Sequence, residues 1–139
     1  ITESAFIGDT RHAVEQLRRL GEIGVTAAID DFGTGYSALS YLRNLPVATL
    51  KIDRAFVSGI DTDEGARRIA DTIVALGSRL GFETVAEGVE TPRQAALLAA
   101  AGCRLAQGYL FSRPLAPEVY RAKLQAAAAG EPLALISAA

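Results

Sequence analysis

Two adjacent carboxylates, Asp30 and Asp31, are the residues of this sequence best suited to do chemistry. They follow a short apolar run, residues 25–29, that we predict to be a strand. Neighbouring carboxylates repel each other unless a proton or a cation lies between them, and oxygen ligands of this kind suit Mg²⁺ or Mn²⁺. Taken alone, such a pair is more often a solvated pair of loop acids. The metal hypothesis therefore depends on which residues accompany the pair.

Three further polar residues stand at the ends of later apolar runs: Lys51, Glu87 and Gln107. Lys51 could hold a water molecule or neutralise phosphate charge, although a snorkelling lysine is the plain alternative. Glu87 could bind a metal or accept a proton from water, and Gln107 could donate a hydrogen bond to a ligand. Together, these residues favour a shared metal-dependent site over a set of solvated side chains.

The elements that must position these residues form a repeating pattern of strands and helices, which predicts an α/β fold with a parallel sheet. Polar residues at the carboxyl ends of apolar strands are typical of a (β/α) barrel of the TIM type, and four βα units are about half of such a barrel. We predict strands over residues 25–29, 48–52, 82–86 and 103–106, and helices from Asp9 or Thr10 to Gly24, over residues 37–45 and 62–80, from a Thr91 cap through Pro92 to Gly102, and over residues 117–128.

The longest of these helices, over residues 62–80, has an apolar stripe with a period of 3.6 residues. We expect this stripe to pack against the sheet. It consists of Ala66, Ile69, Ile73, Leu76 and Leu80.

Composition excludes several classes of function. The 139 residues are half hydrophobic and carry a net charge of −2, which offers no basic surface for long nucleic acid. The single cysteine, Cys103, is expected to be buried. The single histidine, His12, is expected at the surface, which excludes a histidine-based triad or zinc site. Because no apolar run is long enough for a membrane span and no signal peptide is evident, we expect a cytoplasmic domain without membrane contacts.

Two short motifs are similar to sites of other protein classes. Residues 31–33 read Asp-Phe-Gly, as in protein kinases, but the sequence has no glycine-rich ATP loop, VAIK or HRD motif. Gly33, Gly35 and Ala38 match the dinucleotide fingerprint G-x-G-x-x-A, with Asp53 some twenty residues on. Two carboxylates directly before such a loop would oppose a pyrophosphate unless metals intervene. A dinucleotide-binding oxidoreductase is therefore the less favoured alternative.

Five ordered segments resemble the EAL domain, the family of cyclic di-GMP phosphodiesterases. The resemblance runs from Ile1 to about Tyr120 and implies the C-terminal half of a TIM-type barrel over residues 1–128, followed by a tail over residues 129–139. It also implies hydrolysis of cyclic di-GMP to linear pGpG with two Mg²⁺ or Mn²⁺ ions. The segments are ITES (1–4), AIDDFGTGYSALSYL (28–42), LKIDRAFV (50–57), TVAEGVET (84–91) and QGYLFSRPLAP (107–117).

The resemblance implies a role for each matching residue. Metal binding is implied for Asp30, Asp31 and Glu87. Catalysis is implied for Lys51, at the catalytic water, and again for Glu87. Binding of substrate or water is implied for Gln107 and Asp53. Stabilisation of the loop that follows Asp31 is implied for Glu3, Phe32, Gly33, Thr34 and Gly35.

The opening segment ITES reads as the end of an element, and the EAL motif with its glutamate ligand does not occur in the sequence. With three metal ligands of the family thus expected upstream, we expect the 139 residues alone to lack hydrolytic activity. We also expect a homodimer or other self-association through strand edges and an apolar face bearing Val25, Leu50 and Val85. The resemblance is compatible with a regulatory or GGDEF-type domain, or a membrane tether, in a longer protein. A catalytically silent cyclic di-GMP receptor and an interaction module remain alternatives.

Overall fold

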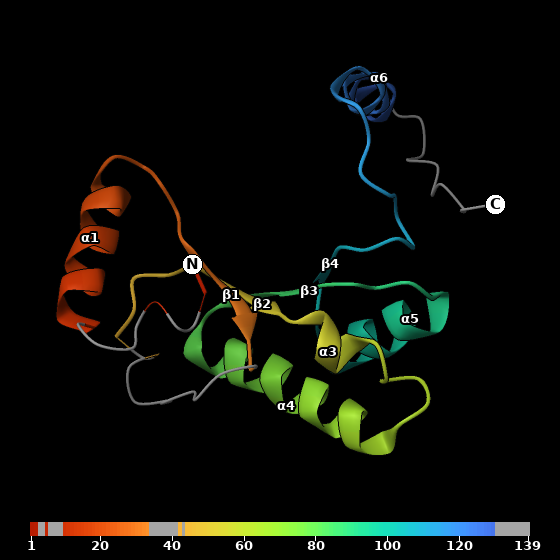
Figure 1. The fold of residues 1–139 in the computed structure, drawn as a ribbon, viewed down its shortest axis with the longest axis horizontal. Coiled ribbons are helices and arrows are strands. Elements are labelled where there is room, and N and C mark those ends of the chain that lie inside the picture. Colours follow the sequence, from red (N-terminus) through yellow and green to blue (C-terminus); the bar gives the residue numbers. More distant parts are fainter. Residues whose placement is uncertain (3–4, 6–9, 34–41, 43, 130–139) are drawn as a thin grey trace.

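The computed structural model describes residues 1–2, 5, 10–33, 42 and 44–129, and it shows one parallel sheet with helices (Figure 1). The order of the strands in the sheet is the order in which they occur in the chain. This arrangement confirms the predicted βα units. The strands are β1 (Ala28–Phe32), β2 (Thr49–Ile52), β3 (Glu83–Ala86) and β4 (Leu105–Ala106), and the helices are α1 (Thr10–Glu22), α3 (Arg54–Val57), α4 (Glu64–Leu80), α5 (Pro92–Ala101) and α6 (Pro117–Ala128).

The first residues of the chain extend the sheet beyond β1. Thr2 forms a parallel bridge with Asp30, the backbone N–H of Asp30 donates to the carbonyl of Ile1 at 2.8 Å, and the N-terminal ammonium donates to the carbonyl of Ala28 at 2.9 Å. The first two residues of ITES thus lie beside β1, and the prediction that this segment is the end of an element stays a prediction. Residues 3 and 4 lie outside the described part of the chain.

Helices cover one face of the sheet, where α4 packs against β2 and β3 (Figure 1). The core lies between them and contains Ile29, Leu50, Ile52 and Ala86, all fully buried. Because side chains alternate along a strand, Thr49 and Lys51 lie on the other face and are only half-buried.

We predicted an exposed apolar face of the sheet bearing Val25, Leu50 and Val85. The prediction was wrong for two of these residues. Leu50 belongs to the face that the helices cover, and Val25 precedes β1 and is 46% exposed. Only Val85 lies on the open face, where its register places it beside Lys51. Val25 lies outside the sheet because pairing begins where Ala28 meets Thr49. Leu50 is buried because it shares the helix-covered side of β2 with Ile52.

Five helix ends agree with their sequence signals. The side chain of Thr91 accepts a hydrogen bond from the N–H of Gln94, whose own side chain accepts from Thr91, so a capping box with Pro92 at the first position starts α5. Gly102 ends this helix in the left-handed conformation. The bounds of α6 agree with the prediction, and α1 ends just before Gly24.

Helix α4 begins at Glu64, two residues later than predicted, because the side chain of Asp63 caps it. The predicted stripe was partly wrong, since Ile69 is 47% exposed. The face buried against the sheet consists of Ala70, Ile73, Val74 and Gly77. The close approach of Gly77 to the side chain of Thr84 fixes this rotation of the helix.

Other predicted elements start later or extend less far than expected. Strand β4 contains only two residues, while Cys103 is buried as predicted, with its thiol donating to the carbonyls of Thr84 and Leu105. The helix predicted over residues 37–45 lies mainly outside the described residues, although Leu42 is helical and buried. The short helix α3 was not predicted.

Helix α6 lies apart from the sheet and contains no buried residue (Figure 1). Its large apolar side chains Val119, Tyr120 and Leu124 are all exposed. Within the described part of the chain, no helix has the length and hydropathy needed to cross a membrane.

Candidate metal centre

A bulge in β1 brings Asp30 and Asp31 to the same side of the sheet. Ile29 pairs with Leu50 and Phe32 pairs with Ile52, so β1 has one residue more than β2 over this stretch. Asp31 takes up the extra length with a φ of +54°, a conformation that aspartate tolerates better than most residues. In a regular strand the two carboxylates would point to opposite faces. The bulge removes that alternation, and the sequence carries no glycine that would have indicated it.

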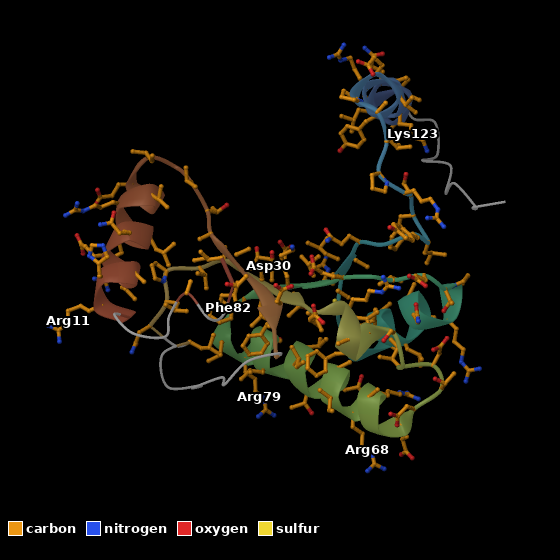
Figure 2. All side chains as sticks on the ribbon, viewed as in Figure 1. Arg11, Asp30, Arg68, Arg79, Phe82 and Lys123 are labelled. Carbon is orange, nitrogen blue, oxygen red and sulfur yellow. The ribbon has the colours of Figure 1, made fainter. Side chains whose placement is uncertain are left out.

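Glu87 completes a group of three carboxylates with the two aspartates. Each of the three contributes an oxygen that lies within 4.8 Å of the others. Glu87 directly follows β3, and its N–H donates to the carbonyl of Ile52 at 3.0 Å, which continues the pairing with β2. Asp30 lies on the side of the sheet away from α4, whose Arg68 and Arg79 point to the opposite side (Figure 2). The predicted metal ligands are thus adjacent on the open face.

Lys51 places a positive charge between two of these acids. Its Nζ lies 2.6 Å from Oδ1 of Asp30 and 2.5 Å from Oε1 of Glu87. The hydrogen bond from Lys51 lowers the pKa of Asp30 below its ordinary value, against the opposing effect of partial burial. Burial alone would lower the pKa of Lys51, but its hydrogen bonds and charge interactions with Asp30 and Glu87 together raise it. The two shifts keep Asp30 and Lys51 oppositely charged at neutral pH.

Gln107 joins the same group from the next strand. Its side-chain Nε2 donates to Oε1 of Glu87 at 2.6 Å, the oxygen that Lys51 also contacts. Its backbone N–H donates to the carbonyl of Ala86, so the pairing of β3 with β4 continues to this residue. Four strand ends therefore contribute to one site, as the sequence pattern predicted.

The remaining predicted site residues have structural contacts or lie outside the described residues. Asp53 caps α3, because its Oδ1 accepts from the N–H of Ala55 at 2.7 Å. Phe32 is buried in the core, and Gly33 lies against the ring of Phe56. The roles expected for these residues in substrate binding or loop stabilisation stay predictions. Glu3, Thr34 and Gly35 lie outside the described residues.

An ion pair beside the site was not found from the sequence. Arg54 Nη2 lies 2.8 Å from Oε1 of Glu90. The sequence contains a spacing that matches this pair, because Arg54 follows Lys51 by three residues and Glu90 follows Glu87 by three. The equal spacing predicts a second ion pair only once β2 and β3 are known to be neighbouring strands.

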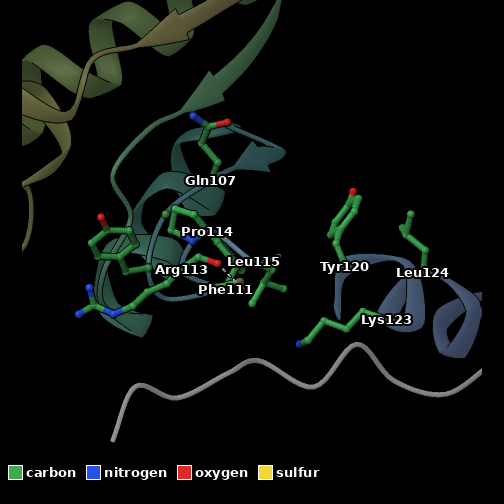
Figure 3. A pocket seen from close by; sticks show the side chains of 11 residues that line it. Gln107, Phe111, Arg113, Pro114, Leu115, Tyr120, Lys123 and Leu124 are labelled. Carbon is green, nitrogen blue, oxygen red and sulfur yellow. Dashed lines mark hydrogen bonds between the residues drawn. The ribbon is translucent and has the colours of Figure 1, made fainter. Parts of the chain in front are cut away.

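A hollow of about 590 Å³ lies next to the site, between the loop after β4 and helix α6 (Figure 3). Gln107 lies at its edge and links it to the carboxylates. Across the hollow, the side chains of Tyr120 and Leu124 lie on the part of α6 that borders it (Figure 3). The lining is mainly apolar and aromatic, with the guanidinium of Arg113 stacked 4.5 Å from the ring centre of Tyr109.

Comparison with known proteins decides the family. A family model described as the EAL domain matches residues 1–114. The chain belongs to the EAL domain family. It is 50% identical over 115 residues to "Cyclic di-GMP phosphodiesterase NbdA" of Pseudomonas aeruginosa, which covers 83% of this chain and 15% of NbdA. The suspected family is therefore confirmed.

Solved EAL structures have the same fold. The structure "PaMucR Phosphodiesterase, c-di-GMP complex" superposes with a TM-score of 0.82 at 44% identity, covering 86% of this chain and 49% of that one. A manganese and cyclic di-GMP complex of Klebsiella pneumoniae BlrP1 superposes with a TM-score of 0.74 at 39% identity, covering 81% and 29%. The parallel sheet with its helices is thus part of a TIM-type α/β barrel. The chain spans about half the length of the matched MucR chain.

Proposed function

We propose that this EAL chain is part of a cyclic di-GMP phosphodiesterase that hydrolyses its substrate to linear pGpG. The observation that carries the proposal is the group of Asp30, Asp31 and Glu87 around the ammonium of Lys51. These residues occur in a chain that is 50% identical over 115 residues to a protein named as a cyclic di-GMP phosphodiesterase. The dinucleotide-binding alternative is not supported, because the family model covers the glycine motif within an EAL domain.

The donor set fits a hard divalent ion. An ion with oxygen bonds of 2.0–2.1 Å places opposite ligands about 4.2 Å apart, so oxygens within 4.8 Å of one another need only small side-chain rotations. Three carboxylates against one ammonium leave the site with excess negative charge. We propose that Asp30, Asp31 and Glu87 hold Mg²⁺ or Mn²⁺, a choice supported by the oxygen ligands and by the manganese in the BlrP1 complex.

Bound divalent ions would supply charge that stabilises the transition state of phosphodiester cleavage and favours deprotonation of water. Glu87, whose side chain is only 15% exposed, would accept the proton that the attacking water loses. Lys51 would orient that water and screen the negative charge of the phosphate. The water oxygen forms the new bond to phosphorus as the bond from phosphorus to the 3′ oxygen breaks, and the 3′ oxygen takes up a proton from solvent water. Gln107 would hold Glu87 in place through its hydrogen bond.

The hollow beside Gln107 supports recognition of a nucleotide. Pockets for small ligands are commonly 300–1,000 Å³ with apolar and aromatic walls, and the hollow has about 590 Å³. We propose that it accepts a planar, apolar part of the substrate while the phosphodiester lies at the carboxylates. MucR carries the name of a bifunctional diguanylate cyclase and cyclic di-GMP phosphodiesterase, which supports a GGDEF-type partner domain for this chain as well.

Magnesium-dependent release of pGpG by the full-length protein tests the proposal. Purified protein would be incubated with cyclic di-GMP in Mg²⁺, in Mn²⁺ and in EDTA, and products would be separated by chromatography. We expect pGpG in both metals and none in EDTA. Binding of cyclic di-GMP without any pGpG would instead support the silent receptor, and no binding in any condition would reject both functions.

A further inference from the structure

Two ion pairs join the end of β2 to the loop that follows β3. Lys51 contacts Glu87 at 2.5 Å, and three residues further along each segment Arg54 contacts Glu90 at 2.8 Å. The first pair lies within the carboxylate site. The second lies outside it, with the Arg54 side chain 63% exposed. The loop over residues 87–90 is therefore tied to the same segment at both of its ends.

The backbone of Arg54 has a fixed position relative to Lys51. Arg54 is the first residue of α3, and the carboxylate of Asp53 caps that helix. The N–H of Ser58 donates to the carbonyl of Arg54 at 2.8 Å. Because α3 starts directly after β2, the strand that carries Lys51 also determines where Arg54 begins.

The aliphatic stem of Arg54 lies directly against Gly88. Gly88 has a φ of +69°, and a Cβ at this position would overlap with Cγ of Arg54. On another side of the loop, the N–H of Val89 donates to the carbonyl of Gln107 at 3.0 Å, and Val89 is fully buried. The loop thus lies between the Arg54 stem and the segment that carries Gln107.

Glu90 is held at both its backbone and its side chain. Its N–H donates to Oε1 of Gln94, the capping-box residue of α5, at 2.8 Å. Its carboxylate accepts from the guanidinium of Arg54 at 2.8 Å. Only Gly88 and Val89 separate Glu90 from Glu87, so the two acids belong to one short loop.

We propose that Arg54 is a positioning residue that holds the 87–90 loop so that the Glu87 carboxylate stays against Lys51 and Gln107. The inference rests on the proposed function, in which Glu87 acts on water. Exposed ion pairs contribute little to stability, whereas a small displacement of a reacting group has a large effect on rate. The consequence of losing Arg54 is therefore expected in the chemical step rather than in folding.

Three variants of the full-length protein separate the effect of the positive charge of Arg54 from the effect of its aliphatic stem. Arg54→Met keeps an aliphatic stem over Gly88 but removes the ion pair, Arg54→Lys keeps a positive charge, and Arg54→Ala removes both. We expect Arg54→Met to lower kcat about tenfold, as is typical for groups that orient metal-site residues, with KM for cyclic di-GMP within about twofold. Arg54→Lys should recover part of the loss, and Arg54→Ala should lose at least as much as Arg54→Met. An unchanged kcat in Arg54→Met would overturn the proposal.

The matched control is Arg68→Met, which removes an exposed ion pair with Glu64 of 2.6 Å on α4, away from the site. It should leave kcat unchanged. Amide hydrogen exchange over residues 87–90 gives a second readout that needs no activity. Faster exchange in Arg54→Met but not in Arg68→Met supports the positioning role, and equal exchange in both overturns it. If the wild-type protein bound no metal and released no pGpG, the proposed function would fail, and the exchange measurement would still decide the role of Arg54 in holding the loop.

Discussion

The ammonium of Lys51 lies 2.6 Å from Oδ1 of Asp30, so the protein's own cation neutralises a carboxylate that we assign to metal binding. Lys51 reaches Glu87 at the same time. In the absence of a divalent ion, Lys51 therefore limits the repulsion among the three acids, and binding of a metal must redistribute these contacts. Because Lys51 pairs with these acids in the folded state, a change in their charge should change the free energy of unfolding.

We predict that Lys51→Met destabilises the metal-free chain at neutral pH, by about 1 kcal/mol or less because the pair is partly exposed. Asp30 has a folded-state pKa below its unfolded value, so its contribution is present above the unfolded pKa and is lost as the pH falls through the folded pKa. The difference in unfolding midpoint between wild type and Lys51→Met should therefore stay constant down to about pH 5 and shrink as the pH falls below the unfolded pKa of 3.8. Thermal unfolding in EDTA across this range is the measurement. Arg19→Met, which removes an exposed pair on α1, is the control, and a difference that grows on acidification would contradict the assignment.

Asp31→Asn should abolish hydrolysis of cyclic di-GMP by the full-length protein while leaving the fold intact. We expect a loss of at least about 100-fold, since even the partners of metal ligands commonly contribute 10- to 100-fold. Release of pGpG in Mg²⁺ and Mn²⁺ and circular dichroism are the two measurements. Asp71→Asn, at an exposed position of α4, should retain activity. Near-wild-type turnover by Asp31→Asn would reject the role of this carboxylate.

The backbone of Asp31 gives a separate prediction about stability. Because its φ is +54°, Asp31→Gly should be more stable than Asp31→Ala by about 1 kcal/mol, the cost of the left-handed conformation for a residue with a Cβ. Urea unfolding in EDTA compares the two variants, which both lack the carboxylate. Equal midpoints would indicate that the bulge in β1 relaxes when Asp31 is replaced.

Manganese should bind to the carboxylate group and raise the unfolding temperature of the chain, since a ligand that binds only the folded state stabilises it. Glu87→Gln should weaken the affinity at least about tenfold, whereas Glu64→Gln, an exposed acid on α4, should not. Isothermal titration with MnCl₂ provides the affinities. Equal affinity in wild type and Glu87→Gln would remove Glu87 from the ligand set.

The 139-residue chain alone is predicted to lack hydrolytic activity and to self-associate. Among the described residues, exposed large apolar side chains lie on α6, at Val119, Tyr120 and Leu124, and on β4, at Leu105. A contact through α6 would cover the hollow beside Gln107 in the isolated chain, since Tyr120 and Leu124 also line it. Light scattering after size-exclusion chromatography should give a mass above the monomer, and Tyr120→Glu combined with Leu124→Glu should reduce it. Glu118→Gln is the control. A monomer at all concentrations, or release of pGpG by the chain alone, would contradict the corresponding half of this prediction.

The sequence by itself determined the order of the strands and indicated the polar residues that the structure brings together at their ends. The Thr91 cap with Pro92, the stop at Gly102 and the bounds of α6 are local signals, because caps and turns depend on a few consecutive residues. The polar residues at strand ends were also visible, since parallel strands bring their carboxyl ends to one edge. The five segments that resemble EAL domains indicated the family without any knowledge of distances.

Only the tertiary structure decided which side of each element is buried and which side chains meet. The burial of Leu50, the exposure of Ile69 and the start of β1 at Ala28 all follow from how β2 and α4 pack. The bulge that turns Asp31 toward Asp30 is a mismatch of length between β1 and β2, and neither strand reveals it alone. The pair of Arg54 and Glu90 joins residues 36 apart in the chain. Such contacts depend on the register between strands, and register is a property of two segments rather than of one.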